Sequence, residues 1–473
     1  MDPMTLRDLA GCLDAPLLDA PDPDAVVRCV TTDSRAVPPD AVFWGIRGSR
    51  HDGSDFAADA SCRGASVSVV SATAKTTGCG PRIVVSDPLA ALTSLAHQVR
   101  SRYEGLVIGV TGSVGKTTTR DMLHMILSTA YEGLQSERNF NNDVGVPLTL
   151  LRLARQHEFA VLELGARQAG EIARLCQIVQ PEVGVVTCIG ETHLESFGSL
   201  ETIAQTKWEL VDALPPNGFA VLNGDDPHLR ALASRAACRV VWVGTGNDGD
   251  YRAERVCLTE DGLQFSVDGH EYLVPVFGRH LLTSCLCALA VATEIGLSPQ
   301  QIAEGFRRVA PLPGRGQRVV SGGCLLIDES YNASPPSVRA AIAQLAEVPC
   351  RRGGRRILVL GDMLELGPTA AAEHFALGQL AAEQQIDQIL AVGEHADAVL
   401  AGAQKSGLPS HNLASLKNLD VLLALLDCSL EPGDVVLVKG SRSMGLERVV
   451  EWFQQVFGPL EPQKHVLLQK ACA

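Results

Sequence analysis

Short, almost uninterrupted apolar runs recur through the middle of the chain, and segments with helical spacing separate them. Strands that are apolar along their whole length are typical of a parallel sheet buried on both faces. Their alternation with helices predicts an α/β fold in which helices cover both faces of that sheet. The runs stand at residues 106–110, 159–164, 183–188, 219–222 and 240–243.

Two segments around these runs have clear local patterns. The segment after the first run has apolar residues at helical spacing on one face, which predicts an amphipathic helix. Residues 250–277 change to a strand-like pattern with hairpin turn signals, which predicts an antiparallel appendage to the sheet. The helical positions are Leu123, Ile126, Leu127 and Ala130, and the turn signals are Asp261-Gly262 and Asp268-Gly269.

Changes of pattern divide the chain into three predicted domains. Residues 1–102 form a small α/β domain, and residues 103–313 carry the apolar runs and the central parallel sheet. A segment rich in Pro and Gly at 311–317 leads into a Rossmann-like α/β domain over 314–473. The outer domains have strand-like runs of their own, at 67–71 and 82–88 and at 356–362, 389–393 and 434–440.

The composition excludes several classes of protein. The chain has 473 residues, a net charge of −14 and only 4% aromatic residues. An acidic chain is a poor ligand for nucleic-acid phosphates, and so few aromatics make a base-stacking surface improbable. No apolar run approaches the length of a transmembrane helix, and the acidic N-terminus does not resemble a signal peptide. We therefore expect a cytoplasmic monomer with no nucleic-acid partner and no membrane insertion.

The cysteines give no sign of a metal or redox site. There are 14 of them, scattered singly from Cys12 to Cys472, with Cys285 and Cys287 as the one close pair. Because no CxxC motif occurs, neither a zinc ribbon nor a thioredoxin-type site is indicated. We expect free thiols that pack as small apolar side chains in a reducing compartment.

The most specific motif is a glycine turn between a buried strand and a helix, VIGVTGSVGKTTTRDML at 107–123. Glycines let backbone N–H groups turn toward phosphates, and the start of the helix adds a positive dipole. Lys116 can reach the β- and γ-phosphates of a nucleotide, and the Thr117 hydroxyl can bind Mg²⁺. The motif predicts a phosphate-binding loop; the alternative is a structural turn before a helix with an exposed lysine.

Two further groups follow strands whose carboxyl ends should lie near that loop. Glu163 ends the strand FAVLELG, and His193 and Glu195 follow the strand VGVVTC. Ligands of open parallel sheets bind beyond the carboxyl ends of the strands. Glu163 is therefore placed to hold Mg²⁺, and a neutral His193 to hold a second divalent ion. The alternatives are a solvated strand-end acid and an ordinary surface histidine.

Other polar residues are ambiguous when taken alone. Lys207 lies in the predicted helix TIAQTKWELVDAL, where a single lysine usually is a solvated charge. Asn139, Asn141 and Asn142 precede a turn proline. They fit equally well as capping and turn residues or as amides that face a phosphoryl or acyl oxygen.

Taken in order, these segments resemble the Mur ligases, the ATP-dependent enzymes that add amino acids during peptidoglycan synthesis. The resemblance rests on TGSVGKTTT, NFNNDVGVPLTLL, ELG, THLESFGS and the lysine of AQTKWEL. One member of the family joins D-alanyl-D-alanine to UDP-N-acetylmuramoyl-tripeptide. Its motifs are similar to DESYNASPPSVRAAI (328–342), GDMLELG (361–367), VLVKGSRSMGLE (436–447) and, in the uridine-nucleotide domain, residues 31–56.

The resemblance implies a reaction in which ATP phosphorylates the terminal carboxylate of the UDP-linked peptide. The amine of the dipeptide then attacks the acyl phosphate, and phosphate leaves. It implies that the N-terminal domain binds the UDP substrate, the central domain ATP, and the C-terminal domain the dipeptide. ATP and Mg²⁺ are the implied cofactors.

The resemblance also assigns roles to single residues. Lys116, Lys207, His193 and Asn142 would be catalytic, and Ser34 and Arg35 would hold the uridine diphosphate. One Mg²⁺ would be held by Thr117 and Glu163, and a second by His193 and Lys207, with the lysine carbamylated. The residues implied to bind ATP are Gly112, Ser113, Val114, Gly115, Lys116, Thr117, Thr118, Arg315 and Asp328.

The chain departs from the family pattern at two places. The G-x-H-N-x-x-N segment that contacts adenine in the family reads GRHLLTS at 278–284, without either asparagine. Ser54 stands where a histidine is common in D-G-H-x-F. Two rival functions are a related ligase, such as a folylpolyglutamate-synthase-like enzyme, and a P-loop regulatory protein that hydrolyses nucleotide without ligation. The motifs at 328–342 and 361–367 argue against the first rival.

Overall fold

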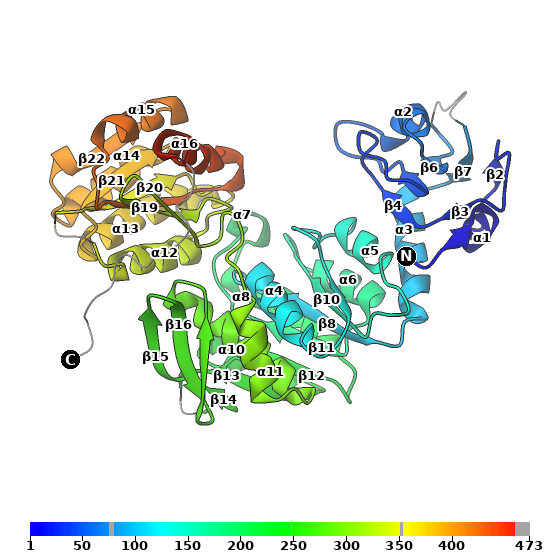
Figure 1. Cartoon of the computed structure of the whole chain (residues 1–473), viewed down its shortest axis with the longest axis horizontal. Coiled ribbons are helices and arrows are strands. Elements are labelled where there is room, and N and C mark those ends of the chain that lie inside the picture. Colours follow the sequence, from blue (N-terminus) through cyan, green and yellow to red (C-terminus); the bar gives the residue numbers. More distant parts are fainter. Residues whose placement is uncertain (75–79, 247, 351–352, 459–473) are drawn as a thin grey trace.

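The computed structural model describes residues 1–458, apart from 75–79, 247 and 351–352, as three α/β domains (Figure 1). Each domain is built on its own sheet, of five, seven and six strands in chain order. The N-terminal and C-terminal domains stand apart from each other, and each approaches the central domain (Figure 1). The predicted fold class is therefore confirmed.

The N-terminal domain has the strand order β2-β7-β6-β5-β4, and β1 pairs separately with β3. Only β2 runs antiparallel to its neighbour within the five-stranded sheet. The strands are β1 (Met4–Thr5), β2 (Leu17–Leu18), β3 (Val26–Val27), β4 (Cys29–Thr31), β5 (Ala41–Trp44), β6 (Val67–Ser71) and β7 (Arg82–Val85), and the helices are α1 (Leu6–Cys12), α2 (Ala57–Cys62) and α3 (Pro88–Ser101).

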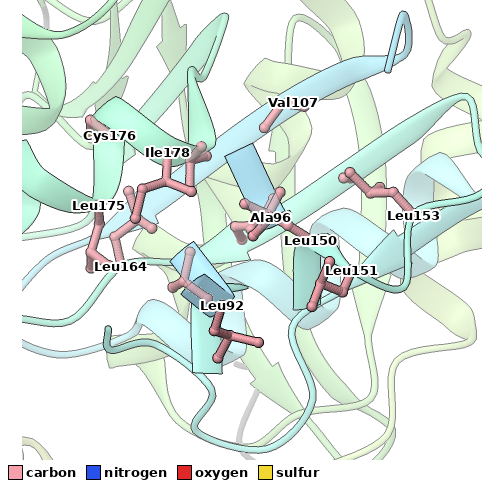
Figure 2. Packing of buried hydrophobic residues seen from close by; sticks show 14 of the residues in the cluster. Leu92, Ala96, Val107, Leu150, Leu151, Leu153, Leu164, Leu175, Cys176 and Ile178 are labelled. Carbon is pink, nitrogen blue, oxygen red and sulfur yellow. The ribbon is translucent and has the colours of Figure 1, made fainter. Parts of the chain in front are cut away.

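Helix α3 joins the N-terminal domain to the central one. Asp87 caps its first turn by accepting hydrogen bonds from two backbone N–H groups. Its apolar face, with Leu92 and Ala96, packs among leucines of the central domain (Figure 2). At its C-terminal end the buried Arg100 donates to the carbonyl of Val179 and forms an ion pair with Glu182. The two domains therefore share one hydrophobic core.

The central sheet is parallel throughout and has the order β14-β13-β12-β11-β8-β10-β9. Its strands are β8 (Leu106–Thr111), β9 (Gly133–Gln135), β10 (Phe159–Glu163), β11 (Val183–Val186), β12 (Phe219–Asn223), β13 (Arg239–Gly244) and β14 (Tyr251–Arg252). The helices are α4 (Lys116–Leu127), α5 (Gly145–Leu150), α6 (Glu171–Val179), α7 (Leu194–Phe197), α8 (Leu200–Asp212), α9 (Pro227–Leu232), α10 (Leu282–Glu294) and α11 (Pro299–Arg307).

Neighbouring residues of the central strands enter different hydrophobic clusters. Val107 packs with helices α5, α6 and α8, whereas Ile108 packs with α4, α10 and α11. Ala160 and Val161 divide in the same way. Because successive side chains of a strand point to opposite faces, this division shows that helices cover both faces of the sheet, and it explains the apolar runs.

The structure corrects one local prediction and confirms another. Helix α4 ends at Leu127, so Ala130 lies beyond it and is exposed, whereas the other three predicted positions are buried. The Thr129 hydroxyl donates to the carbonyl of Ile126 and so satisfies a group of the last turn. The predicted antiparallel appendage is confirmed as a separate three-stranded sheet, whereas Tyr251–Arg252, at the start of the same segment, form the edge strand β14 of the central sheet. The strands of the appendage are β15 (Glu254–Thr259), β16 (Gly262–Val267) and β17 (His270–Val274).

The C-terminal sheet has the order β18-β19-β23-β20-β21-β22, with only the edge strand β18 antiparallel. Helices α12, α13 and α14 pack on one face, and α15 and α16 on the other. The strands are β18 (Gln317–Ser321), β19 (Cys324–Glu329), β20 (Arg356–Gly361), β21 (Gln388–Val392), β22 (Leu413–Leu416) and β23 (Val435–Lys439), and the helices are α12 (Pro335–Glu347), α13 (Ala370–Glu383), α14 (Ala396–Lys405), α15 (Leu419–Ser429) and α16 (Glu447–Phe457).

Two general expectations can be compared with the described residues. The cysteines in this part of the chain are free thiols, as expected, whereas Cys79 and Cys472 lie outside it. None of the helices that the structure describes has the length and apolar character needed to cross a membrane.

Candidate functional site

A cleft of about 1200 Å³ opens between the central and C-terminal domains. Most of its lining comes from the carboxyl ends of the central strands and from the loops of the C-terminal domain that follow β19, β20 and β23. Leu89 at the start of α3 also reaches it. The candidate residues of the central and C-terminal domains that line it are Ser113, Val114, Gly115, Lys116, Thr117, Thr118, Asn142, Glu163, His193, Lys207 and Arg315.

The predicted phosphate loop connects β8 to α4. Gly112 and Gly115 have φ angles of +143° and +84°, in the region that residues with a Cβ rarely adopt. A Cβ on Gly112 would also collide with the side-chain oxygen of Thr187. The ammonium of Lys116 donates to the carbonyls of Gly112 and Ser113, at 2.7 and 3.1 Å. The loop therefore curls around its own lysine, with the helix start beside it.

Glu163 lies at the carboxyl end of β10, next to this loop. The side chain is buried, and its carboxylate accepts a hydrogen bond from the Thr117 hydroxyl at 2.8 Å. Asn141 donates to the other carboxylate oxygen at 2.8 Å, and Arg120 forms an ion pair with Glu163 at 3.5 Å. Two hydrogen-bond donors and the Arg120 guanidinium therefore surround this carboxylate. The structure thus brings together the hydroxyl and the carboxylate predicted to hold one Mg²⁺.

The asparagines divide between the two alternatives left open by the sequence. The Asn142 side-chain oxygen accepts from the backbone N–H groups of Val144 and Gly145, so this residue caps a turn before α5 while also lining the cleft. Asn141 is the amide that contacts the buried Glu163. Asn141 is one of the three asparagines whose role the sequence left open, whereas no sequence pattern singled out Arg120.

Lys207 is buried in α8, with 2% of its surface exposed. Its ammonium lies 5.6 Å from the centroid of the Phe197 ring. Burial, followed by the charge of Lys116, lowers the pKa of Lys207 to about 7. A lysine with this pKa is substantially neutral at physiological pH, which the solvated-charge alternative does not predict.

His193 follows β11 and has a left-handed backbone conformation, with φ +54°. Its Nδ1 forms a hydrogen bond with the carboxylate of Glu365, which belongs to the C-terminal domain. Burial lowers the pKa of His193, the hydrogen bond and the charge of Glu365 oppose that shift, and the charges of Lys116 and Lys207 add to it. His193 and Lys207 both line the cleft, and the direction of the shift favours a neutral imidazole.

The two residues of the C-terminal domain that were predicted to bind ATP lie at different depths, one in the cleft lining and one behind it. The Arg315 guanidinium lines the cleft and stacks over the Tyr331 ring, with 4.0 Å to the centroid. Asp328 lies buried behind it, at the end of β19. One Asp328 oxygen accepts from the N–H of Gly314 and the other from the N–H and hydroxyl of Ser330. Asp328 therefore holds the turn that carries Arg315.

Lys439 is a cleft residue that sequence reasoning quoted inside a motif but did not single out. It ends β23, is buried, and donates to Glu329 at 3.3 Å and to the carbonyl of Asn332 at 3.0 Å. Burial lowers the pKa of Lys439, with Glu329 opposing that shift. Its position at a strand end, like that of Glu163, was the signal that could have identified it.

The predicted uridine-diphosphate ligands lie in the N-terminal domain, outside the cleft lining. Arg35 is exposed and makes a two-pronged contact with Asp33, with both distances at 2.9 Å. The hydrogen bond from Arg35 lowers the pKa of Asp33 to about 2. Ser34 lies between these residues and is half-buried. Ser54, at a departure from the family pattern, is buried and links the Gly45 carbonyl to the Ser71 N–H.

The other departure, at residues 278–284, lies at the cleft. His280, Leu281 and Ser284 line it where the family pattern has its adenine contacts. Ser284 stands close to the phosphate loop, since a Cβ on Gly115 would lie 3.2 Å from its hydroxyl oxygen. Residues 278–284 therefore lie beside the phosphate loop, but Leu281 and Ser284 stand where the family pattern has its two asparagines.

The residues present fit Mg²⁺. Mg²⁺ prefers oxygen ligands, and in nucleotide sites one or two protein groups and the phosphates hold it, together with water. Thr117 and Glu163 supply such oxygens at the phosphate loop. Across the described ranges, no group of three or more His, Cys, Asp or Glu side chains could enclose a metal ion on its own. Binding of Mg²⁺ at this site would therefore need further oxygen ligands from the nucleotide phosphates.

Comparison with known proteins identifies the family. Residues 26–101 match the model "Mur ligase family, catalytic domain", residues 110–292 "Mur ligase middle domain" and residues 314–442 "Mur ligase, glutamate ligase domain". The UDP-N-acetylmuramoyl-tripeptide–D-alanyl-D-alanine ligase of Mycobacterium tuberculosis is 37% identical, over 95% of this chain and 97% of that protein. The chain belongs to the Mur ligase family.

Solved structures of Mur ligases agree with this assignment. MurF from Acinetobacter baumannii has a TM-score of 0.84 at 30% identity, covering 96% of this chain and 99% of that one. MurF from Thermotoga maritima, solved in complex with ADP, has a TM-score of 0.78 at 28% identity, covering 91% and 97%. The Mur ligase resemblance seen in separate motifs thus extends to the whole three-domain arrangement.

Proposed function

We propose that this chain is the ATP-dependent ligase that joins D-alanyl-D-alanine to UDP-N-acetylmuramoyl-tripeptide, in cytoplasmic peptidoglycan precursor synthesis. The observation that carries the proposal is the cleft itself. It gathers a phosphate loop, the Glu163 carboxylate and a buried lysine of low pKa on one side, and the basic residues Arg315 and Lys439 on the other. Such a site suits two negatively charged groups that must be held together.

The first chemical step requires the peptide carboxylate to attack the γ-phosphorus of ATP. The bond to the ADP oxygen breaks, and an acyl phosphate and ADP form. Lys116 and the N–H groups of its loop would hold the phosphates, and Arg315 would approach them from the other domain. Asn142 would present its amide to the phosphoryl oxygens, as the resemblance implies. The protein's task in this step is to position two anions in line and to neutralise them.

The second step requires the amine of D-alanyl-D-alanine to attack the acyl carbon. An amide bond forms, phosphate leaves with the C–O bonding electrons, and the amine loses a proton. The basic side of the cleft in the C-terminal domain would hold the dipeptide carboxylate. The central domain and the C-terminal domain must therefore face each other across the cleft. The positions of Arg315 and Lys439 in the cleft lining agree with this requirement.

Magnesium is part of the proposal. Thr117 and Glu163 would hold one Mg²⁺, and His193 with a carbamylated Lys207 would hold a second. Bound there, the ions would neutralise negative charge on the phosphoryl and acyl oxygens. Ser34 and Arg35 would hold the uridine diphosphate, and Asp328 would act on the nucleotide through the Arg315 turn. We further propose that the domains span residues 1–102, 103–313 and 314–473 and that the enzyme is a monomer.

The experiment is a coupled measurement of phosphate release and amide product. The full chain is supplied with ATP and Mg²⁺, with the lysine or the diaminopimelate form of the UDP-linked tripeptide, and with D-alanyl-D-alanine. We expect phosphate release to require both substrates and mass spectrometry to find the UDP-linked pentapeptide. D-alanine alone serves as the control amine. Nucleotide hydrolysis that is indifferent to both substrates would contradict the proposal and favour the regulatory P-loop alternative.

A further inference from the structure

A carboxylate of the C-terminal domain contacts the candidate metal-binding histidine of the central domain. Glu365 accepts a hydrogen bond from Nδ1 of His193, although 172 positions separate them in the chain. The same two segments also meet through the backbone, because the Glu195 N–H donates to the Glu365 carbonyl at 3.2 Å. The two loops are therefore joined by a side-chain hydrogen bond and by a backbone hydrogen bond.

The loop that carries Glu365 is fixed within its own domain. The N–H of Met363 donates to His374 at 2.9 Å, and the N–H of Leu364 donates to the Ser441 hydroxyl at 2.9 Å. Leu366 is buried in the C-terminal core. Glu365 itself has φ +61°, a conformation that a residue with a Cβ adopts only when its surroundings impose it. The carboxylate is therefore presented by a rigid loop.

The hydrogen bond has a definite consequence for the imidazole. A carboxylate can only accept, so Nδ1 must carry the hydrogen. In a neutral ring the lone pair then lies on Nε2, which is the atom left to bind a metal ion. Metal-binding histidines almost always donate their other N–H to a carboxylate, a carbonyl or water, and this contact fixes the tautomer and the ring orientation. Glu365 is placed to act on His193 in this way.

We propose that Glu365 is a positioning residue, which puts His193 into its Mg²⁺-binding tautomer and orientation only when the C-terminal domain is docked. Docking of the C-terminal domain on the central domain is then a requirement for assembly of the second metal site. The inference rests on the proposed function, because it assumes that His193 binds the second ion. It adds a residue to that site from the domain that brings the dipeptide.

The test counts bound metal ions and needs no turnover. Mn²⁺ is titrated into the full chain saturated with a non-hydrolysable ATP analogue, and free Mn²⁺ is measured by electron paramagnetic resonance. The wild type should bind Mn²⁺ at two sites. Glu365→Ala should weaken the second site by about 10- to 100-fold and leave the first unchanged. Glu365→Gln, which keeps an acceptor oxygen, should lose less.

A matched control removes another contact between the same two domains. Glu347 of α12 forms an ion pair with Arg279 at 3.2 Å, and no hydrogen bond or ion pair among the described residues joins either of them to His193. Glu347→Ala should bind Mn²⁺ like the wild type. His193→Ala should lose the second site, and adding Glu365→Ala to it should cause no further loss.

Each other outcome has a separate meaning. Wild-type Mn²⁺ binding by Glu365→Ala, or equal losses in Glu365→Ala and Glu347→Ala, would overturn the inference and leave the ligase function standing. A wild type with one Mn²⁺ site would overturn it too, together with the second Mg²⁺ of the proposed function. Failure of the function itself would appear only in the phosphate and amide measurement.

Discussion

Lys116 lowers the pKa of Lys207: after burial, its charge is the largest cause that brings that pKa to about 7. The two lysines come from different elements, the start of α4 and the middle of α8, and both line the cleft. If both lysines were charged, they would be expected to bind anions jointly. The low pKa instead makes the Lys207 amine available in the neutral form, which is the form that adds CO₂.

Carbamylation of Lys207 leads to the first prediction. Lys207→Arg keeps a positive charge but cannot form the carbamate, so we expect it to be as inactive as Lys207→Ala. Acetate, formate or bicarbonate should partly restore activity to the alanine variant, because a small carboxylate can occupy the vacated position. Amide product is measured for each variant with and without the added acid. Wild-type turnover by the arginine variant would show that a plain electrostatic role replaces the carbamate.

The second prediction concerns stability and pH. The pKa of Lys207 is about 7 in the folded chain and near 10.5 when unfolded, so between these values the unfolded chain binds more protons. Stability therefore rises with pH across this window. Lys207→Met lacks the titrating amine, so it should exceed the wild type in stability at pH 7. That advantage should shrink by roughly 2 kcal/mol by pH 9.

Urea unfolding in CO₂-free buffer measures this difference. Lys417→Met is the control, because Lys417 is exposed. Its stability relative to the wild type should not change between pH 7 and pH 9. An advantage of Lys207→Met that stayed constant over the same range would contradict a depressed pKa at Lys207.

The third prediction is the loss of ligation in Lys116→Met. The Lys116 ammonium contacts only carbonyls of its own loop, Gly112 and Ser113, among the described residues. We therefore expect near-wild-type circular dichroism and thermal unfolding. Losing ~3 kcal/mol of transition-state stabilisation lowers the rate more than a hundredfold. Activity within about threefold of the wild type would count against the phosphate-loop assignment.

The sequence was a good guide wherever one segment carried the whole signal. The apolar runs predicted the central strands, because a strand buried on both faces leaves no polar positions. Asp268-Gly269 predicted its turn correctly, with both residues at positive φ. The end of α4 was placed too late, because Ala130 continues the apolar spacing while the backbone has already left the helix.

Long-range pairing could not be predicted in the same way. Glu163 lies beside Thr117, as the parallel order of β8 and β10 requires. No local pattern indicates that Glu365 meets His193, because this contact depends on domain docking. The roles assigned to the site residues stay predictions.

The fourth prediction is compaction on ligand binding. The cleft is lined from separate domains, and the central and C-terminal domains touch through small polar contacts such as Arg279–Glu347. Contacts of this kind permit rotation. Small-angle scattering should show a smaller radius of gyration when the ATP analogue and the UDP-linked tripeptide are both present. The same radius with and without the two ligands would argue for a preformed site.

The fifth prediction concerns the joint at α3. Arg100 is 5% exposed and donates to the carbonyls of Val179 and Gln180 as well as to Glu182, which is also hydrogen-bonded to the Val107 N–H. Arg100→Ala leaves these acceptors without their donor, so the free energy of unfolding should fall by about 2–4 kcal/mol.

Arg102→Ala is the matched control for Arg100→Ala. Arg102 is exposed at the end of the same helix. Chemical denaturation should find its stability within about 0.5 kcal/mol of the wild type. Equal stability of the two variants would mean that the buried guanidinium does not hold the joint together.

The core shared through α3 restricts how the three domains can move. Bending between the N-terminal and central domains would expose Leu92 and Ala96 to water, whereas rotation of the C-terminal domain breaks mainly polar contacts. Of the two joints that a chain of three domains offers, only one is therefore free to act as a hinge. We therefore expect the molecule to move as two bodies about a single axis, with a constant distance across α3 throughout the catalytic cycle.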